Sequence, residues 1–224
     1  MIVGTALITL CPAIAKANVT YSFTHIVEDG DGLTELADGA IGEAQMFVDV
    51  DDFGTSPGTG RNRVIFTFRN TGPQASSITD VYFDDGALFK MVTIDNSDSG
   101  VSFSQFAKPA ELPGGNCLTP PFDTSAGFSA DSDAPVQHNG VNPGESLGIV
   151  FDLKNGMAYD DVLNALANPT DVDDGLRIGI KVQGFASGGS EAFVNNGIIP
   201  APGAILLTSV GVALVGWLRR SRRL

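Results

Sequence analysis

RVIFTFR, residues 63–69, places Val64, Phe66 and Phe68 on one face of an extended chain. Successive side chains of a β-strand point to opposite faces, so this alternation predicts a strand with one buried face. The same period of two recurs in two later segments, residues 147–153 and 177–183. Strands that bury one face and expose the other are typical of antiparallel sheets.

Six further segments carry a weaker alternation and are separated by Gly, Pro, Asn and Asp: residues 21–26, 45–51, 77–83, 88–94, 101–106 and 191–195. Nine such strands predict an all-β fold, an antiparallel β-sandwich with a jelly-roll or immunoglobulin-like layout. One short helix is predicted over residues 159–166, where apolar side chains recur at i, i+3, i+4 and i+7. Asn168-Pro169 is expected to end that helix.

Residues 107–144 form the longest stretch without a clear period. They carry six of the twelve prolines and five glycines. A loop of this length is unusual inside a compact domain and is often functional. Two interpretations stay open: a surface excursion that covers one end of the sandwich, or a lid that contacts a ligand.

Residues 18–197 form the predicted ectodomain, a single domain long enough to bury a core. They hold all 26 acidic residues but only eight of the 13 basic ones, a net charge of −18. A surface this acidic repels phosphate groups, so no nucleic-acid partner is expected. Cys11 would leave with a signal peptide and Cys117 would then stand alone, so no internal disulfide is expected.

Residues 1–17 have the features of a secretory signal peptide. An apolar centre precedes Ala15-Lys16-Ala17, which fits the A-x-A pattern of a cleavage site, and cleavage after Ala17 would leave Asn18 first. The basic residues that usually begin such a peptide are missing, so we expect the peptide to start further upstream. The sequence therefore predicts export from the cytoplasm.

Residues 198–224 combine a proline-rich hinge, an uncharged run and a basic terminus. The run at about 204–218 is predicted to be a transmembrane helix; its 15 residues would rise about 22 Å, against a hydrocarbon core of about 30 Å. The side chains expected to anchor it at the membrane surface are Trp217, Arg219, Arg220, Arg222 and Arg223. Arginines favour the cytoplasmic side, which would leave the body outside. The alternative is a buried C-terminal helix followed by a basic end.

The hinge Pro200-Ala201-Pro202 and the segments after it resemble the PEP-CTERM sorting signal of exopolysaccharide-producing Gram-negative bacteria. The resemblance implies that an exosortase, an integral-membrane cysteine protease, recognises the motif and processes the tail. The acidic middle residue usual in the family is Ala201 here, which leaves the exosortase subtype open.

Four body segments are also similar to small PEP-CTERM ectodomains: residues 70–73, 76–86, 143–147 and 175–185. This similarity implies a β-domain of the cell surface or extracellular matrix, and it transfers no catalytic residue to this chain.

Residues 95–100 are the strongest metal candidate, because Asp95, Ser97 and Ser99 offer oxygen ligands at alternate positions before a glycine. The twelfth position is Phe106, so the bidentate glutamate of a calcium loop is missing. A turn between strands is the alternative interpretation. No other cofactor is expected, and the two histidines and Cys117 lack the spacing of a zinc site.

Gly144-Glu145-Ser146-Leu147-Gly148 matches the G-x-S-x-G motif of serine hydrolases. That motif needs a strand before the serine and a helix after it. Here a Pro-Gly turn precedes Ser146 and a strand follows, so the order is wrong and a turn is predicted. Only His25 and His138 could act as the base.

These observations predict an exported, non-enzymatic protein of the cell surface or extracellular matrix. Its expected partners are an exosortase, the inner membrane that holds the precursor, and an extracellular polysaccharide of the biofilm kind. The alternative is a carbohydrate-binding module that stacks sugars on Tyr21, Tyr82, Tyr159 or phenylalanine rings. A hydrolase is the third interpretation.

Overall fold

The computed structural model describes residues 18–28, 31–85, 89–124, 128–154, 156–170 and 175–199. The strands are β1 (Val19–His25), β2 (Met46–Thr55), β3 (Asn62–Asn70), β4 (Ser77–Asp85), β5 (Phe89–Asp95), β6 (Phe103–Gln105), β7 (Phe128–Ser132), β8 (Ser146–Leu153), β9 (Leu176–Gln183) and β10 (Glu191–Ile199). The helices are α1 (Leu33–Gln45), α2 (Val136–Asn139) and α3 (Tyr159–Ala167), with a 3-10 turn, η1 (Gly115–Cys117).

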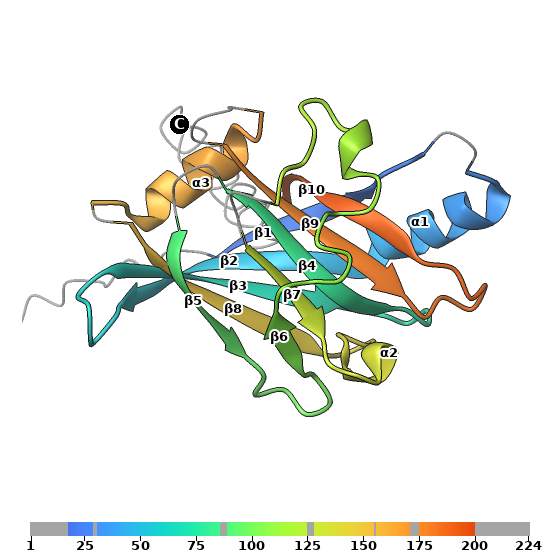
Figure 1. The fold of residues 1–224 in the computed structure, drawn as a ribbon, viewed down its shortest axis with the longest axis horizontal. Helices are drawn as coiled ribbons and strands as arrows, with labels where there is room; N and C mark the ends of the chain where they lie inside the picture. Colours follow the sequence, from blue (N-terminus) through green and yellow to red (C-terminus); the bar gives the residue numbers. More distant parts are fainter. Residues whose placement is uncertain are drawn as a thin grey trace, which may run out of the picture.

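The ten strands form one antiparallel sheet in the order β5-β8-β3-β2-β1-β10-β9-β4-β7-β6. The prediction of an antiparallel all-β protein is confirmed. The strands form one continuous sheet, however, and not the two separate sheets of a sandwich. The reason is that β1 pairs with β2 on one side and with β10 on the other, which joins the two halves by hydrogen bonds (Figure 1).

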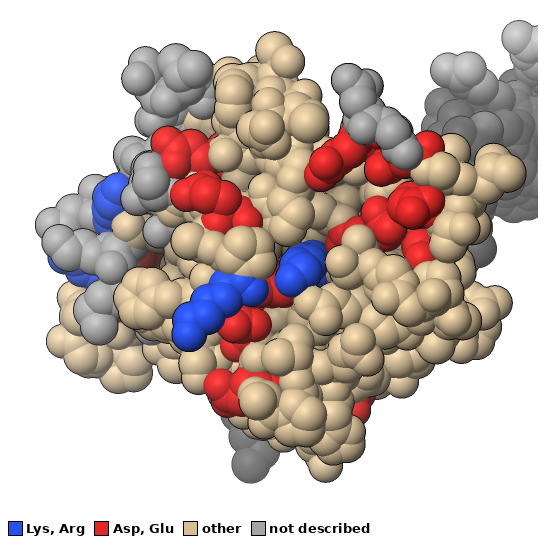
Figure 2. Space-filling model, turned by 45° about the vertical axis from the view of Figure 1, so that its right-hand side comes forward, with Lys and Arg blue, Asp and Glu red and all other residues tan. Residues whose placement is uncertain are grey.

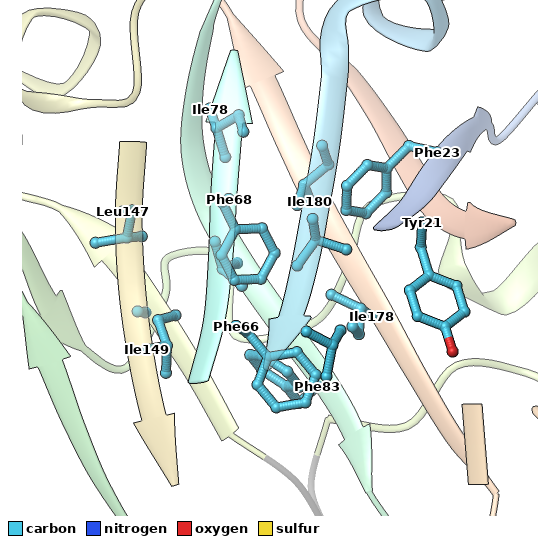
Figure 3. Packing of buried hydrophobic residues seen from close by; sticks show 14 of the residues in the cluster. Tyr21, Phe23, Phe66, Phe68, Ile78, Phe83, Leu147, Ile149, Ile178 and Ile180 are labelled. Carbon is cyan, nitrogen blue, oxygen red and sulfur yellow. The ribbon is translucent and has the colours of Figure 1, made fainter. Parts of the chain in front are cut away.

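The sheet curls so that its two halves face each other across a core of aromatic rings (Figure 3). Phe66 of β3 and Phe83 of β4 lie far apart in the strand order, yet their ring centroids are 5.0 Å apart. Phe83 also packs edge-on against Phe151 of β8, at 4.9 Å. These side chains are fully buried, and their packing supplies much of the hydrophobic stabilisation of the fold.

The two outer strands of the sheet also approach each other. Asn96, just after β5, donates to the Phe103 carbonyl of β6 at 3.0 Å and accepts from the Phe103 amide at 2.9 Å. The amide side chain of Asn96 therefore completes backbone hydrogen bonds at the place where the sheet nearly closes.

All nine predicted strands are present, and so is the predicted helix, α3. Tyr159 of α3 donates to the Val50 carbonyl at 2.8 Å, while Val162 and Leu166 enter the core, so α3 covers one end of it. The prediction of a single short helix was wrong. The pattern missed α1 and α2, and it missed β7, which lies inside the stretch of residues 107–144.

Local propensity explains why α1 was missed. Its sequence contains Gly39 and Gly42, and glycine weakens a helix by about 1 kcal/mol relative to alanine. Both glycines permit close packing, because a Cβ on Gly42 would lie 2.2 Å from the Phe193 ring and one on Gly39 would lie 2.4 Å from Nδ1 of His25. The helix therefore forms despite its glycines, because only small residues fit between α1 and the side chains of β1 and β10.

Within the part of the chain that the structure describes, no helix is both long enough and apolar enough to cross a membrane. The predicted transmembrane helix at 204–218 lies outside those residues, as does the predicted signal peptide at 1–17. Ile198 and Ile199 are described, and they belong to β10. The last strand thus continues two residues beyond Gly197, where the ectodomain was predicted to end.

Candidate functional site

The Pro-rich segment of residues 106–124, here called the strap, crosses the outer face of the sheet (Figure 1). The hydroxyl of Tyr82 on β4 donates to the Pro109 carbonyl of the strap at 3.0 Å. Leu112 lies on Gly179 of β9, where a Cβ would come within 2.6 Å of the leucine side chain. A second hydrophobic cluster fills the space between strap and sheet: Ile26, Tyr82, Ala107, Leu112, Phe122 and Ala192.

Arg177 of β9 holds the far end of the strap. Its guanidinium donates to the carbonyls of Pro120 and Pro121, both at 2.6 Å, and it forms an ion pair with Asp84 of β4. The Phe122 ring lies 5.2 Å from the same guanidinium. These contacts make the strap a fixed cover of the sheet face, which is closer to the predicted surface excursion than to a lid. It covers the outer face, however, and not one end of the molecule.

A row of polar side chains crosses the outer face beside the strap. Antiparallel pairing places Lys181 of β9 opposite Asp80 of β4, Asp80 opposite Asp131 of β7, and Asp131 opposite Ser104 of β6. Nζ of Lys181 lies 3.7 Å from Oδ2 of Asp80, and the Thr79 hydroxyl donates to the same oxygen at 2.8 Å. We call these four paired residues, from Lys181 to Ser104, the polar row.

Burial controls the charge of the two carboxyl groups in the polar row. It raises the pKa of Asp80 to about 6, although Thr79 and Lys181 oppose the shift. Burial also raises the pKa of Asp131, which shares a side-chain hydrogen bond with Asp80. Oδ1 of Asp80 is buried and receives no donor among the described residues. When Asp80 is protonated, its carboxyl group can donate a hydrogen bond to the Asp131 carboxylate, which gives both groups a hydrogen-bond partner.

An open hollow of about 460 Å³ lies at the β6–β7 end of the polar row. Its main lining residues are Ser104, Gln105, Phe106, Lys108, Asp131 and Asp133. Asp133 accepts hydrogen bonds from the hydroxyls of Ser102, at 2.6 Å, and Ser104, at 2.8 Å. These two bonds lower the pKa of Asp133, so its carboxylate is charged and fixed in position.

Phe106 is the unusual residue of this hollow. Its ring is 79% exposed, and its φ of 74° lies in the left-handed region that side chains rarely adopt. Sequence reasoning did not single it out as a binding residue, although a signal was present. Alternation from Val101 and Phe103, which face the core, places Phe106 on the opposite face with Ser104.

A second hollow, of about 230 Å³, lies on the other side of the strap, next to Pro113 and Lys181. Its wall also includes four carboxylates, those of Glu28, Asp31, Glu35 and Glu191. Glu191 is held by Nε2 of His25 at 2.9 Å. Across the described ranges, no three His, Cys, Asp or Glu side chains converge in the way that a metal ion requires.

Of the predicted calcium residues, Asp95 is the last residue of β5, and Ser97 and Ser99 lie in the connection between β5 and β6. Oδ1 of Asp95 accepts from the Ser97 amide at 3.0 Å, while Oδ2 of Asp98 accepts from the Ser146 amide at 2.9 Å. The two carboxylates are therefore engaged in different hydrogen bonds, one within the turn and one with β8. Ser99 lies in the same turn and is exposed.

Ser146 of the G-x-S-x-G match is the first residue of β8, as the turn interpretation predicted. Its hydroxyl donates to Asp98 at 3.0 Å. The two histidines of the chain lie elsewhere: His25 contacts Glu191, and His138 belongs to α2. The structure therefore places neither candidate histidine base at Ser146.

The tyrosines proposed as a stacking platform are all buried, so that part of the carbohydrate-binding hypothesis was wrong. Tyr21, Tyr82 and Tyr159 are each at most 4% exposed. The large aromatic side chains at the described surface are Phe106 and Phe53, the latter 43% exposed. Among the described residues, Phe106 is the most exposed aromatic side chain on which a sugar could stack.

Two groups of predicted site residues lie outside the described residues. These are the cleavage-site residues Ala15 and Ala17, and the sorting and anchoring residues Pro200, Ala201, Pro202, Trp217, Arg219, Arg220, Arg222 and Arg223. Comparison of the chain with protein-family models, curated proteins and solved structures found no match. The site is therefore interpreted from its own geometry.

Proposed function

We propose that this chain is the precursor of an exported, non-enzymatic protein of the cell surface or extracellular matrix. An exosortase of the inner membrane processes its tail, and the mature protein associates with an extracellular polysaccharide. One observation carries the proposal: Pro200-Ala201-Pro202 is followed by an uncharged run at 204–218 and by four closely spaced arginines. This combination is typical of a membrane-directed sorting tail.

The geometry of the body supports this proposal. Thr20 of β1 pairs with Ile199 of β10, and Tyr21 pairs with Ile198. The predicted signal peptide and the predicted tail would therefore leave the body side by side, at one end of one strand pair. Either segment, if inserted in a membrane, would attach the body by the same end of the sheet. Removal of residues 1–17 and of the residues after Pro202 would leave all ten strands whole.

Two further features favour a binding or structural role over catalysis. The G-x-S-x-G serine is the first residue of a strand, and neither histidine of the chain lies beside it. Asp80 and Asp131 are adjacent and share a hydrogen bond, so they do not flank a space for a scissile bond.

The proposal is tested in a Gram-negative host that makes the full chain, with and without its exosortase gene. We expect mass spectrometry of the mature protein to show Asn18 as the first residue and loss of the residues after Pro202. A double variant, Pro200→Ala with Pro202→Ala, keeps the apolar run and should accumulate unprocessed in the inner membrane. Detection of an intact Leu224 on soluble cytosolic protein, in the presence of exosortase, would contradict the proposal.

A further inference from the structure

Two unfavourable features coincide at Phe106. An exposed aromatic ring loses the stabilisation that burial would give it, and a φ of 74° is sterically costly for any residue with a side chain. The neighbouring strand holds this conformation: the Phe106 amide donates to the Ser129 carbonyl at 2.8 Å, and the Ala107 amide donates to the Ser129 hydroxyl at 3.1 Å. Strained residues that the surrounding structure maintains in this way cluster at binding sites.

The hollow beside the Phe106 ring offers polar groups that are already fixed. Both carboxylate oxygens of Asp133 are oriented by serine hydroxyls, and each can accept a further hydrogen bond. Gln105 contributes an amide, which both donates and accepts, and Lys108 contributes an ammonium donor. An aromatic surface next to a few convergent polar groups is the general composition of a small-ligand site. The volume, about 460 Å³, is within the usual range for such sites.

We propose that this hollow binds a pyranose unit of a neutral polysaccharide, with the Phe106 ring stacked on the sugar and Asp133 and Gln105 bound to its hydroxyls. A pyranose has an apolar C–H face and a rim of hydroxyl donors and acceptors, which match these groups. The inference names the ligand class for the polysaccharide association in the proposed function, on which it rests, but binding itself requires neither export nor processing.

The negative charge of the residues that line the hollow favours neutral glycans over acidic ones. Asp131 and Asp133 line the hollow, and Lys108 is its sole basic lining residue among those described. Acidic groups also surround the few basic ones on the face that Figure 2 shows. A uronic acid or sulfated sugar would meet this negative potential and be repelled.

A protein partner fits these residues less well. A stable protein interface buries on the order of 800 Å² on each side, around an apolar centre. Here one exposed ring stands among charged and hydroxyl groups, which suits a ligand with many hydroxyls better.

The experiment measures mobility of the full chain, purified in mild detergent, in native gels. Separate gels contain dextran, mixed-linkage β-glucan, xylan or galactomannan, and an alginate gel serves as the anionic comparison. We expect retardation by at least one neutral polysaccharide. Phe106→Ala should weaken it by about tenfold, since an aromatic contact of this kind is worth up to about one decade in affinity. Phe106→Trp should retain it.

Phe53→Ala is the matched control, because Phe53 is also an exposed ring but lies on β2, with Arg63 4.7 Å from its centroid. This variant should bind as the parent does. Phe106→Gly should weaken binding as much as Phe106→Ala does, yet unfold at a higher temperature, because glycine adopts a φ of 74° without steric cost. Weaker binding together with a higher unfolding temperature would show that Phe106 serves binding and not stability.

Several results would overturn the inference: no retardation in any neutral gel, retardation by alginate alone, equal binding by the Phe106→Ala variant, or a lower unfolding temperature for Phe106→Gly. Failure of the proposed function would be visible separately, as an unprocessed tail in the mass spectra. A protein that is processed but does not bind neutral glycans keeps the sorting proposal and loses this one.

Discussion

Asp80 is 1% exposed, and its neighbours on the sheet are Lys181 and Asp131. Burial raises its pKa from 3.8 to about 6, so the folded state holds a proton that the unfolded chain releases near pH 4. For an acid with a raised folded pKa, the stabilising contribution is present below the unfolded pKa. It is lost as pH rises through the folded value. The free energy of unfolding therefore falls as the pH rises from about 4 to about 6, because Asp80 keeps in the folded state a proton that the unfolded chain has released.

Replacement of Asp80 by Asn should remove that loss. The amide can donate to Asp131 and accept from Thr79, as the protonated acid does. We expect Asp80→Asn to exceed the parent in free energy of unfolding by roughly 1–3 kcal/mol at pH 7, since two pKa units are worth about that much. The difference should shrink toward pH 4. Urea unfolding at pH 4, 5.5 and 7 measures it.

Asp133→Asn is the control, because this substitution should change the free energy of unfolding at pH 7 in the opposite direction to Asp80→Asn. The hydroxyls of Ser102 and Ser104 lower the pKa of Asp133, so its charged form stabilises the folded state above the unfolded pKa. This variant should be less stable than the parent at pH 7. Parallel pH curves for the parent and Asp80→Asn would show that Asp80 does not titrate as described.

At the scale of elements, α1 shows packing overriding local propensity. Gly42→Ala would raise helix propensity by about 1 kcal/mol in an isolated helix. In this fold the new Cβ would lie 2.2 Å from the Phe193 ring, which is fully buried and cannot move away freely. We expect a net loss of about 1–3 kcal/mol in the free energy of unfolding, as is usual for overpacked sites.

Thermal and urea unfolding monitored by circular dichroism measure this loss. Gly58→Ala is the control, because Gly58 lies in a turn and a Cβ there would meet no atom within 4 Å. Its stability should stay close to that of the parent. A more stable Gly42→Ala protein would mean that α1 does not rest on Phe193.

The strap depends on a small cluster of its own, in which Leu112 is 4% exposed. Leu112→Ala should lower the free energy of unfolding by about 2–3 kcal/mol, toward the low end for buried leucines. It should also speed thermolysin cleavage within residues 106–124. Asn116→Ala, at an exposed position of the same segment, should change neither. Unchanged proteolysis of Leu112→Ala would show that other contacts fix the strap.

At the scale of the whole molecule, the first and last strands meet near the middle of the sheet order. β1 and β10 join the two halves, and their pairing extends to Thr20 and Ile199. A chain cut after Ile199 keeps every strand, whereas one cut after Gly197 loses the pairs of Ile198 and Ile199 with β1. The two-residue difference tests where the folded body ends.

We expect the 18–199 fragment to unfold cooperatively and the 18–197 fragment to be less stable by about 1–2 kcal/mol, the usual size for two lost backbone hydrogen bonds. Differential scanning calorimetry of the two fragments, at equal concentration and pH, makes the comparison. Equal unfolding temperatures would place the end of the body before Ile198.

The period of two in residues such as Val64, Phe66 and Phe68 was enough to locate nine strands, because alternation is a local property of each segment. The same local logic located α3. It could not locate α1, whose glycines make sense only beside Phe193 and His25. It also failed for β7, whose short run becomes a strand because β4 and β6 lie on either side of it.

The candidate site was harder to predict from the sequence than the strands were. Local patterns predicted acidic turns, a tyrosine platform and a sorting tail; the tyrosines are buried, and the tail stays a prediction from its residues. The polar row, the exposed Phe106 ring and the raised pKa of Asp80 depend on which strands become neighbours. That choice rests on contacts between residues far apart in the chain. Local patterns in the sequence were enough for nine of the ten strands and for the net charge, because both are properties of short segments or of composition. Contacts between distant residues decide that one curled sheet, and not two, brings Asp80, Asp131 and Phe106 to a common face.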